Sequence, residues 1–158
     1  MSTTRALRPV TPSATIPAAG QPVSAIPPGT PSASPVPTRE GSPRSVVDHV
    51  ADFYGAYTDA LHDLGQGQLA HALRHHYLTA KLCADLIRWE AAHLGDGVLR
   101  AKGVPTRWNV AYNDSGMGHC WSRVTLAWDE PGHETHQTRL LVRSDLDSRR
   151  ISGIWTDE

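Results

Sequence analysis

The hydrophobic pattern of the chain first becomes regular after Ser45. From there apolar residues recur at steps of three and four positions, which is the spacing of one buried face of an α-helix. The stripe of this first helix consists of Val46, Val50, Phe53, Tyr57, Leu61 and Leu64. Ser45 is a favoured N-cap residue, Asp48 resembles the acidic partner of a capping box, and Gly65 ends the pattern. The sequence therefore predicts a long amphipathic helix between Ser45 and Gly65.

Two shorter helical patterns follow. Leu69, Leu73 and Tyr77 repeat at four-residue steps and predict a second helix. Thr79 resembles another N-cap, and the third helix that it begins is expected to end at Gly95. The buried face of this third helix is expected to carry Leu82, Leu86, Trp89 and Ala92 or His93.

After Pro105 the period changes to two, which is typical of strands with one buried face. Four strands are expected, through residues 108–112, 119–128, 135–143 and 150–155. The turns between them are expected at 113–116, 129–132 and 144–148. Connections this short join antiparallel neighbours. The sequence thus predicts an α+β domain in which three N-terminal helices pack on a curved antiparallel sheet.

Residues 1–44 differ in composition from the rest of the chain. They contain ten of the twelve prolines and no aromatic residue, and such a segment cannot bury enough apolar surface to offset its ordering entropy. We therefore expect a disordered Pro/Ser/Thr/Ala-rich arm at 1–44 and a folded domain at 45–158. Four arginines and one glutamate give the arm a net charge of +3, which leaves −4 for the domain. That acidic balance argues against a nucleic acid partner.

The sequence also bears on location. No apolar run approaches the about 18 residues of a transmembrane segment, and Arg5 and Arg8 interrupt any signal-peptide core. The chain as numbered is therefore expected in the cytoplasm, whereas a true start further upstream would make it extracytoplasmic, since Ser/Thr/Pro-rich stalks often follow export signals. Cys83 and Cys120 would be free thiols in the first case and could form a disulfide in the second.

The element order and three segments resemble a known superfamily. The segments are Val46-Val-Asp-His-Val-Ala-Asp-Phe-Tyr-Gly-Ala-Tyr57, Tyr77-Leu-Thr-Ala-Lys-Leu82 and Asp96-Gly-Val-Leu. They look like those of small, mostly uncharacterised bacterial domains of the nuclear transport factor 2-like (cystatin-like) superfamily. The resemblance covers residues 45–158 and implies a sheet that bends around the long helix to make a conical cavity.

This superfamily includes isomerases, dehydratases, polyketide cyclases, transport factors and ligand-binding domains, so the resemblance leaves function open. Its isomerases need a carboxylate base together with Tyr and protonated-acid oxyanion donors. Tyr54 and Tyr57 could echo the Tyr donor, whereas no Asp matches the base position. An enzyme of this kind would use Tyr57, Asp114 and His119 as acid and base groups of the cavity.

Aromatic residues are the more suggestive feature of the domain. All five Trp lie after residue 44, and a pocket lined by Trp and Tyr suits a flat or aliphatic ligand. Ligand contacts are expected from Tyr57, Trp89, Trp108, Trp121 and Trp128. We favour a non-catalytic module that binds a small apolar or aromatic molecule or a protein, with a homodimer through the sheet as one such partner. The alternative is a small cofactor-free enzyme of the isomerase, dehydratase or cyclase kind.

No metal or cofactor is predicted. His71 and His75 have the i, i+4 spacing that puts two imidazoles on one helix face, as chelation requires. Ala72, however, stands where zinc peptidases with an HExxH motif carry Glu, and no third ligand is identifiable. Exposed surface histidines are the simpler interpretation of this pair.

Overall fold

The computed structural model describes Gly20 and residues 38–158. Most of the expected disordered arm therefore lies outside the described residues. Arg39–Glu158 forms one compact unit, so the last residues of the proline-rich segment belong to it. Arg39 donates a hydrogen bond to the Asp52 carboxylate at 2.6 Å, and its guanidinium lies 4.9 Å from the centre of the Trp108 ring.

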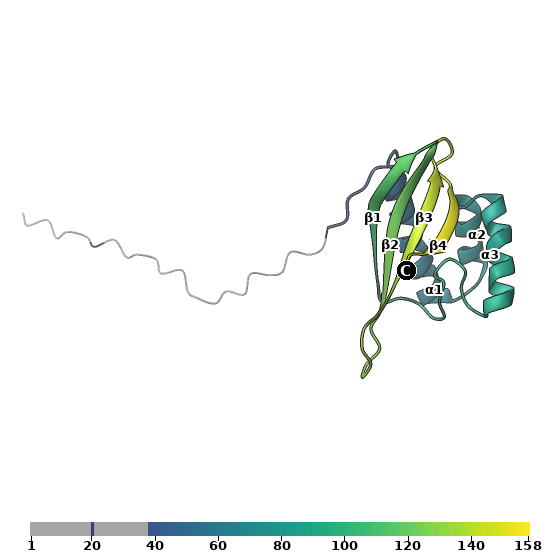
Figure 1. Ribbon diagram of the computed structural model, residues 1–158. Helices are drawn as coiled ribbons and strands as arrows, with labels where there is room; N and C mark the ends of the chain where they lie inside the picture. Colours follow the sequence, from purple (N-terminus) through teal and green to yellow (C-terminus); the bar gives the residue numbers. More distant parts are fainter. Residues whose placement is uncertain (1–19, 21–37) are drawn as a thin grey trace, which may run out of the picture. The chain divides into compact units, whose positions relative to one another are not determined.

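Three helices precede the sheet, as predicted: α1 (Val46–Leu64), α2 (Gln68–Tyr77) and α3 (Ala80–His93) (Figure 1). The Ser45 hydroxyl caps α1 by accepting the Asp48 amide at 3.1 Å, and the Thr79 hydroxyl caps α3 by accepting the Leu82 amide at 3.2 Å. Both caps satisfy backbone donors that have no partner within the helix. No helix in the described part of the chain is long and apolar enough to cross a membrane.

Two details at the helix ends differ from the prediction. Asp48 does not complete a capping box, because its carboxylate accepts the Ser42 amide at 2.8 Å while the Ser45 amide donates to the Ser42 carbonyl. The Asp48 carboxylate and the Ser45 amide, the two groups that would complete the box, are thus both bonded to Ser42 in the turn before the helix. At the other end, α3 stops at Leu94, which adopts the left-handed conformation with φ of 53°. Leu94, and not Gly95, is the C-terminal cap.

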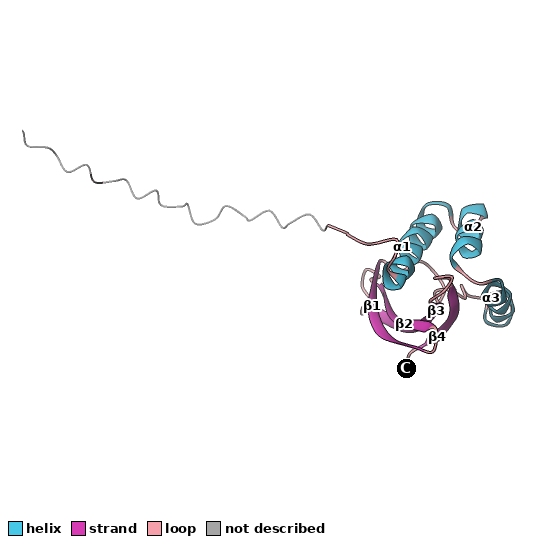
Figure 2. Cartoon of the chain, turned by 90° about the horizontal axis from the view of Figure 1, so that it is seen from above, coloured by secondary structure: helices cyan, strands magenta, loops and turns pink. Residues whose placement is uncertain are grey.

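Four antiparallel strands form one sheet in sequence order: β1 (Arg107–Gly116), β2 (His119–Trp128), β3 (His136–Asp145) and β4 (Ile151–Thr156). Figure 2 shows the sheet as an arc whose open side is closed by the helices. This is the predicted α+β architecture of three N-terminal helices on an antiparallel sheet. Besides packing on α2, α1 contacts β1 and β2 of the sheet, whereas α3 lies against β4.

The predicted turn at 113–116 is wrong. Those residues continue β1, which pairs with β2 as far as Gly116 and His119. The turn consists of Met117 and Gly118, with φ of 52° and 79°, and two consecutive positive φ values define a type I′ hairpin. A bulge at Asn113 absorbs one residue of the polar run that imitated a turn.

The third strand runs two residues further than predicted. Ser144 and Asp145 remain in the sheet because they pair with Cys120 and His119 of β2. The following turn therefore lies closer to β4, and Arg149 takes a positive φ of 59° within it. The extension lengthens the β2–β3 ladder at the end of the sheet that carries the type I′ hairpin.

The core lies between α1 and the concave face of the sheet. In β2, Val124 and Leu126 are fully buried on this face, whereas Trp121, Arg123 and Thr125 alternate onto the opposite, outer face. The largest fully buried side chains come from all parts of the domain and are Phe53, Tyr54, Tyr57, Leu78, Leu86, Leu99, Leu126, Leu140, Ile151 and Ile154. The predicted two-residue alternation of β2 is therefore confirmed.

Candidate functional site

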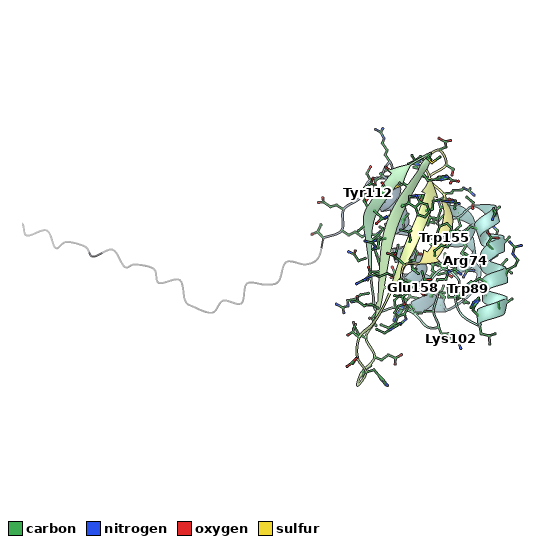
Figure 3. All side chains as sticks on the ribbon, in the orientation of Figure 1. Arg74, Trp89, Lys102, Tyr112, Trp155 and Glu158 are labelled. Atoms are coloured by element: carbon green, nitrogen blue, oxygen red, sulfur yellow. The ribbon has the colours of Figure 1, made fainter. Side chains whose placement is uncertain are left out.

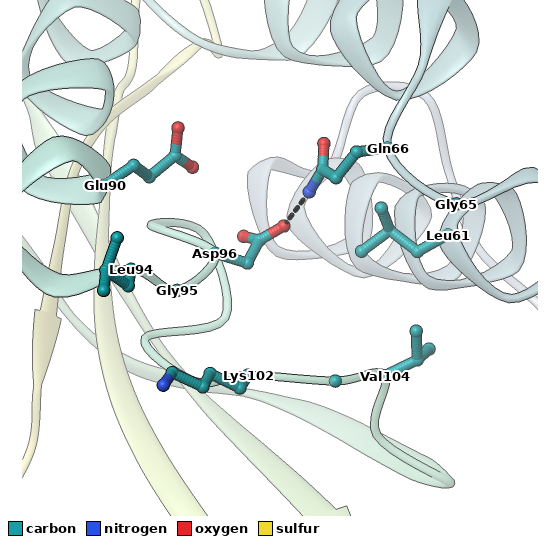
Figure 4. A pocket seen from close by; sticks show the side chains of 10 residues that line it. Leu61, Gly65, Gln66, Glu90, Leu94, Gly95, Asp96, Lys102 and Val104 are labelled. Atoms are coloured by element: carbon teal, nitrogen blue, oxygen red, sulfur yellow. Dashed lines mark hydrogen bonds between the residues drawn. The ribbon is translucent and has the colours of Figure 1, made fainter.

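A pocket of about 530 Å³ opens where the C-terminal ends of α1 and α3 meet residues 94–104 (Figure 4). Its apolar lining consists of Leu61, Leu94 and Val104. Its polar lining consists of Gln66, Glu90, Asp96 and Lys102. The chain reversal after α1 supplies Gln66, and the left-handed turn that ends α3 directs Asp96 back toward the domain interior. We call Gln66, Glu90 and Asp96 the charged wall of the pocket; Lys102 lies apart from them, on the same side as Val104 (Figure 4).

Behind the charged wall, the Tyr57 hydroxyl sits at the centre of a buried network. It donates to Asp96 Oδ2 at 2.7 Å, and it accepts from Arg74 Nε at 3.0 Å and Arg74 Nη2 at 2.7 Å. Gln66 Nε2 donates to the same carboxylate oxygen at 2.5 Å, the contact drawn in Figure 4. One phenol therefore joins α1, α2 and the segment that follows α3.

The Asp96 carboxylate also orders the backbone around it. Asp96 Oδ1 accepts the amides of Val98 at 2.8 Å and Leu99 at 3.1 Å. Its side chain is only 7% exposed. With both oxygens occupied by donors of the protein itself, Asp96 is held as a structural acceptor.

Arg74 and Glu90 form a bidentate ion pair between α2 and α3. The two guanidinium Nη atoms donate to the two carboxylate oxygens at 2.6 and 3.2 Å, and Glu90 Oε1 also accepts the Gly97 amide at 2.8 Å. The side chain of Arg74 is 11% exposed and that of Glu90 25%. The fork geometry and partial burial make this pair stronger than an ion pair in water.

Ionisation in the network follows from these contacts. Burial first, and then the Asp96 carboxylate, raise the pKa of Tyr57 far above its usual range. Burial would by itself raise the pKa of Glu90, but hydrogen bonds from Arg74 and the Gly97 amide lower it below its ordinary value of 4.5. At neutral pH, Tyr57 is therefore a proton donor and Glu90 is ionised.

Tyr57 is the only predicted acid or base group that lies next to this pocket. Asp114 is exposed near the end of β1, where its side chain accepts the Ser115 amide at 2.8 Å. His119 pairs with Asp145 at 3.1 Å on the outer face of the sheet. The sheet separates these two residues from Tyr57. The structure does not bring the three acid and base candidates together.

The predicted ligand-contacting tryptophans are also dispersed. Trp108 packs against α1 from the concave face of β1, close to Gly55. Trp128, on the same face, lies near His136, with ring centres 5.8 Å apart. Trp121 is on the outer face of the sheet, 5.5 Å from Trp155 between ring centres. These residues belong to separate regions and do not line the pocket beside Tyr57.

Trp89 is the remaining member of that set. It lies on α3 beside Trp155 of β4 (Figure 3), and it does not line the pocket beside Tyr57. Its ring stacks on His93 with centres 4.2 Å apart and planes 6° apart. The Arg100 guanidinium lies 4.6 Å from the Trp89 ring centre and donates to the Ile154 carbonyl at 2.6 Å. Trp89 thus helps to fasten α3 to the edge of the sheet.

Sequence reasoning missed Arg74, Glu90, Asp96 and Gln66. The predicted stripe of α2 used Leu69, which is 49% exposed, whereas Ala70 and Arg74 are buried. Arg74 is charged, so the apolar pattern gave no reason to place it on the buried face of α2. Of the other missed residues, only Asp96 had a signal in the sequence. Asp before Gly is typical of a turn in which the Asp side chain accepts a hydrogen bond from a nearby backbone amide.

Comparison with known proteins supports the fold alone. No protein-family model and no curated protein sequence matches the chain. The structure is similar to the crystal structure, at 2.10 Å resolution, of a protein of unknown function from Bacteroides thetaiotaomicron VPI-5482. The TM-score is 0.57 at 19% sequence identity, over 70% of this chain and 88% of the other. The likeness extends over nearly all of that protein.

Proposed function

We propose that the domain is a non-catalytic binding module of the nuclear transport factor 2-like superfamily, with its ligand in the pocket between α1, α3 and residues 94–104. The proposed superfamily is supported by three helices before a four-stranded meander and by the sheet that curves around the helical side. One observation supports the proposed binding activity. The charged wall of the pocket, Gln66, Glu90 and Asp96, is held in place by hydrogen bonds within the protein itself.

The fixed wall argues for binding and against turnover. A general acid or base must exchange a proton with the substrate and therefore needs a free lone pair or proton. Asp96 accepts four donors, and Tyr57 donates to Asp96 while accepting from Arg74. Neither group can meet a substrate without breaking the network that connects the helices. Because the charged wall is held rigid, it favours ligands whose shape already fits the pocket.

The lining indicates the kind of ligand. Leu61, Leu94 and Val104 offer a surface for an apolar body. Lys102, on the loop side, makes no hydrogen bond or ion pair with any described residue. We therefore infer a small molecule with an apolar or aromatic body and an anionic or hydrogen-bond-accepting group, which Lys102 would contact.

Native mass spectrometry of the full chain purified from its own cells tests this proposal. We expect a small molecule that dissociates on denaturation, and we expect Val104→Trp, which fills the pocket, to lose it. Ile87→Trp is the matched control, because Ile87 is exposed on α3 and does not line the pocket. Bare protein from the wild type, or equal loads in the two variants, would contradict the proposal.

A cofactor-free isomerase, dehydratase or cyclase-like activity is the second candidate. It is supported by one observation, a Tyr57 hydroxyl 2.7 Å from a carboxylate beside the pocket. If the module is such an enzyme, Tyr57→Phe will abolish conversion of the co-purified molecule while the pocket still retains it. Equal recovery of unchanged molecule from wild type and Tyr57→Phe supports the binding module instead.

For the protein partner, we propose a homodimer through the outer face of the sheet. Trp121, Arg143 and Trp155 form a cluster there, which we call the outer-face cluster: the Arg143 guanidinium lies 5.9 Å from one indole and 5.4 Å from the other. Trp155 is 45% exposed. Exposed Trp and Arg side chains are typical anchors of protein interfaces.

A further inference from the structure

We propose that His71 and His75 form a bidentate site for a late first-row divalent metal ion, with Cu²⁺ bound most tightly. Both side chains are exposed on α2, one helical turn apart. The site lies on a different element from the lining of the pocket, and it is independent of the proposed binding function.

The two imidazoles converge. Their Nε2 atoms are 2.9 Å apart, their ring centres 4.4 Å apart, and their planes 70° apart. The two Nε2 atoms are thus closer to each other than the ring centres are, so the two nitrogens face one another on the exposed side of α2. In the metal-free pair one Nε2 carries a proton and donates it to the other.

These separations are close to those of two neighbouring ligands on one metal ion. With metal–nitrogen bonds of about 2.05 Å at a right angle, two such nitrogens lie about 2.9 Å apart and their ring centres about 4.5 Å apart. Tetrahedral ligands at the same bond length would be about 3.3 Å apart, with ring centres beyond about 5 Å. The observed 2.9 Å is also the length of the hydrogen bond that joins the metal-free pair, so small rotations of the two exposed rings reach either geometry. Cu²⁺ is expected to bind most tightly because it stands highest in the Irving–Williams order.

Other histidine pairs of the domain do not share this geometry. The His49 and His76 ring centres are 6.5 Å apart, farther than those of two neighbouring ligands on one metal ion. Among the described residues, no group of three His, Cys, Asp or Glu could hold a metal. Water or an exchangeable ligand must fill the remaining positions, so the site is unlike a closed structural zinc site.

Binding requires only a change of tautomer. Both imidazoles must present an unprotonated Nε2, so the proton shared by the pair moves to Nδ1 of the ring that carried it. No oxidation or reduction takes place. Because the ion links residues four apart, it also stabilises the native α2 against unfolding.

The test is a titration of the tag-free full chain with Cu²⁺, Ni²⁺ and Zn²⁺ in a weakly coordinating buffer, followed by calorimetry and by electron paramagnetic resonance of the Cu²⁺ complex. We expect one tight Cu²⁺ per chain, hyperfine coupling to two imidazole nitrogens, and affinities in the order Cu²⁺, Ni²⁺, Zn²⁺. Loss of a residue that only supports a metal ligand weakens metal binding by about tenfold or more. His75→Ala removes a ligand itself and should weaken Cu²⁺ binding by more than about tenfold.

Two controls separate chelation from the general affinity of histidine for metals. His76→Ala removes an exposed histidine from the same helical turn and should leave the tight site intact. The double variant His75→Ala, Leu69→His keeps nine histidines, but the new one is two positions from His71 and seven from His76, and neither is the three- or four-residue spacing at which helical side chains meet. It should lose the tight site. Unchanged Cu²⁺ affinity in His75→Ala or in the double variant, or tightest binding of Zn²⁺, would overturn the proposal.

Discussion

At the scale of single residues, Arg74 has the largest structural role of the charged side chains. It meets Tyr57 and Glu90 directly and lies 3.5 Å from Asp96. A buried cation with several partners contributes mainly because its removal leaves those partners uncompensated. We therefore expect loss of Arg74 to disturb the buried network more than it disturbs the lining of the pocket.

Arg74→Met keeps much of the side-chain volume and removes the charge. We expect a loss of about 3 kcal/mol in the free energy of unfolding, since Glu90 and Asp96 would remain partly buried without their cation. Arg88→Met is the matched control on α3, because Arg88 pairs with Asp85 at the surface and should cost less than about 1 kcal/mol. Urea unfolding of both variants measures the difference, and equal losses would contradict this role.

Glu90 makes stability depend on pH. Its folded pKa lies below the ordinary value of 4.5, so the unfolded chain binds the proton more tightly. The stabilisation is therefore fully present above about pH 5.5 and is lost as the pH falls through the folded pKa. Urea unfolding from pH 3 to pH 7 should show a shallower acid slope for Glu90→Gln than for wild type. An unchanged slope would show that other carboxylates account for it.

At the scale of elements, the β1–β2 hairpin is less stable than its geometry allows. Met117 is 99% exposed and holds a positive φ of 52°, a conformation that costs a residue with a side chain about 1 kcal/mol. Asn tolerates this region, and Asn-Gly is the favoured pair of a type I′ turn. The side chain at position 117 therefore decides how much strain the turn carries.

Met117→Asn should raise the free energy of unfolding by up to about 1 kcal/mol. Met117→Val, which is β-branched, should lower it, because branching at Cβ makes the left-handed region worse. Thermal unfolding followed by circular dichroism measures both variants. A Met117→Asn variant no more stable than wild type would mean that the turn is not type I′ in solution.

At the scale of the whole molecule, the helices cover only one face of the sheet. The opposite face carries the outer-face cluster, in which the Trp155 indole lies over Gly153, so that a Cβ at this position would collide with the ring. Gly153 thus lets a large aromatic side chain lie flat against the sheet, which presents a broad apolar surface for a second copy.

Sedimentation of the full chain should show a dimer that Trp155→Ala converts to monomer. Tyr112→Ala is a suitable control, since Tyr112 is 58% exposed on β1 outside the outer-face cluster. Circular dichroism checks that both variants keep the fold. A monomeric wild type, or an equal effect of the two substitutions, would argue against dimerisation through this face.

Much of the domain follows from local patterns. The caps at Ser45 and Thr79, the three helices and the alternation of β2 depend on residues within a few positions of each other, so the sequence alone predicted them. The hairpin turn was misplaced because Asn113 to Gly116 have the composition of a turn, and only pairing across β2 shows that a bulge absorbs the extra residue.

The pocket and the buried network depended on tertiary structure. Tyr57 lies 17 residues from Arg74 and 39 from Asp96 along the chain, and no periodicity connects such distant positions. Burial of Arg74, while Leu69 stays exposed, was decided by packing of α2 against its neighbours, because an apolar pattern gives no reason to bury a charged residue. Sequence by itself determined the local elements, since their hydrogen bonds are short-range. Only the folded chain decided which polar groups meet, because their partners come from different elements.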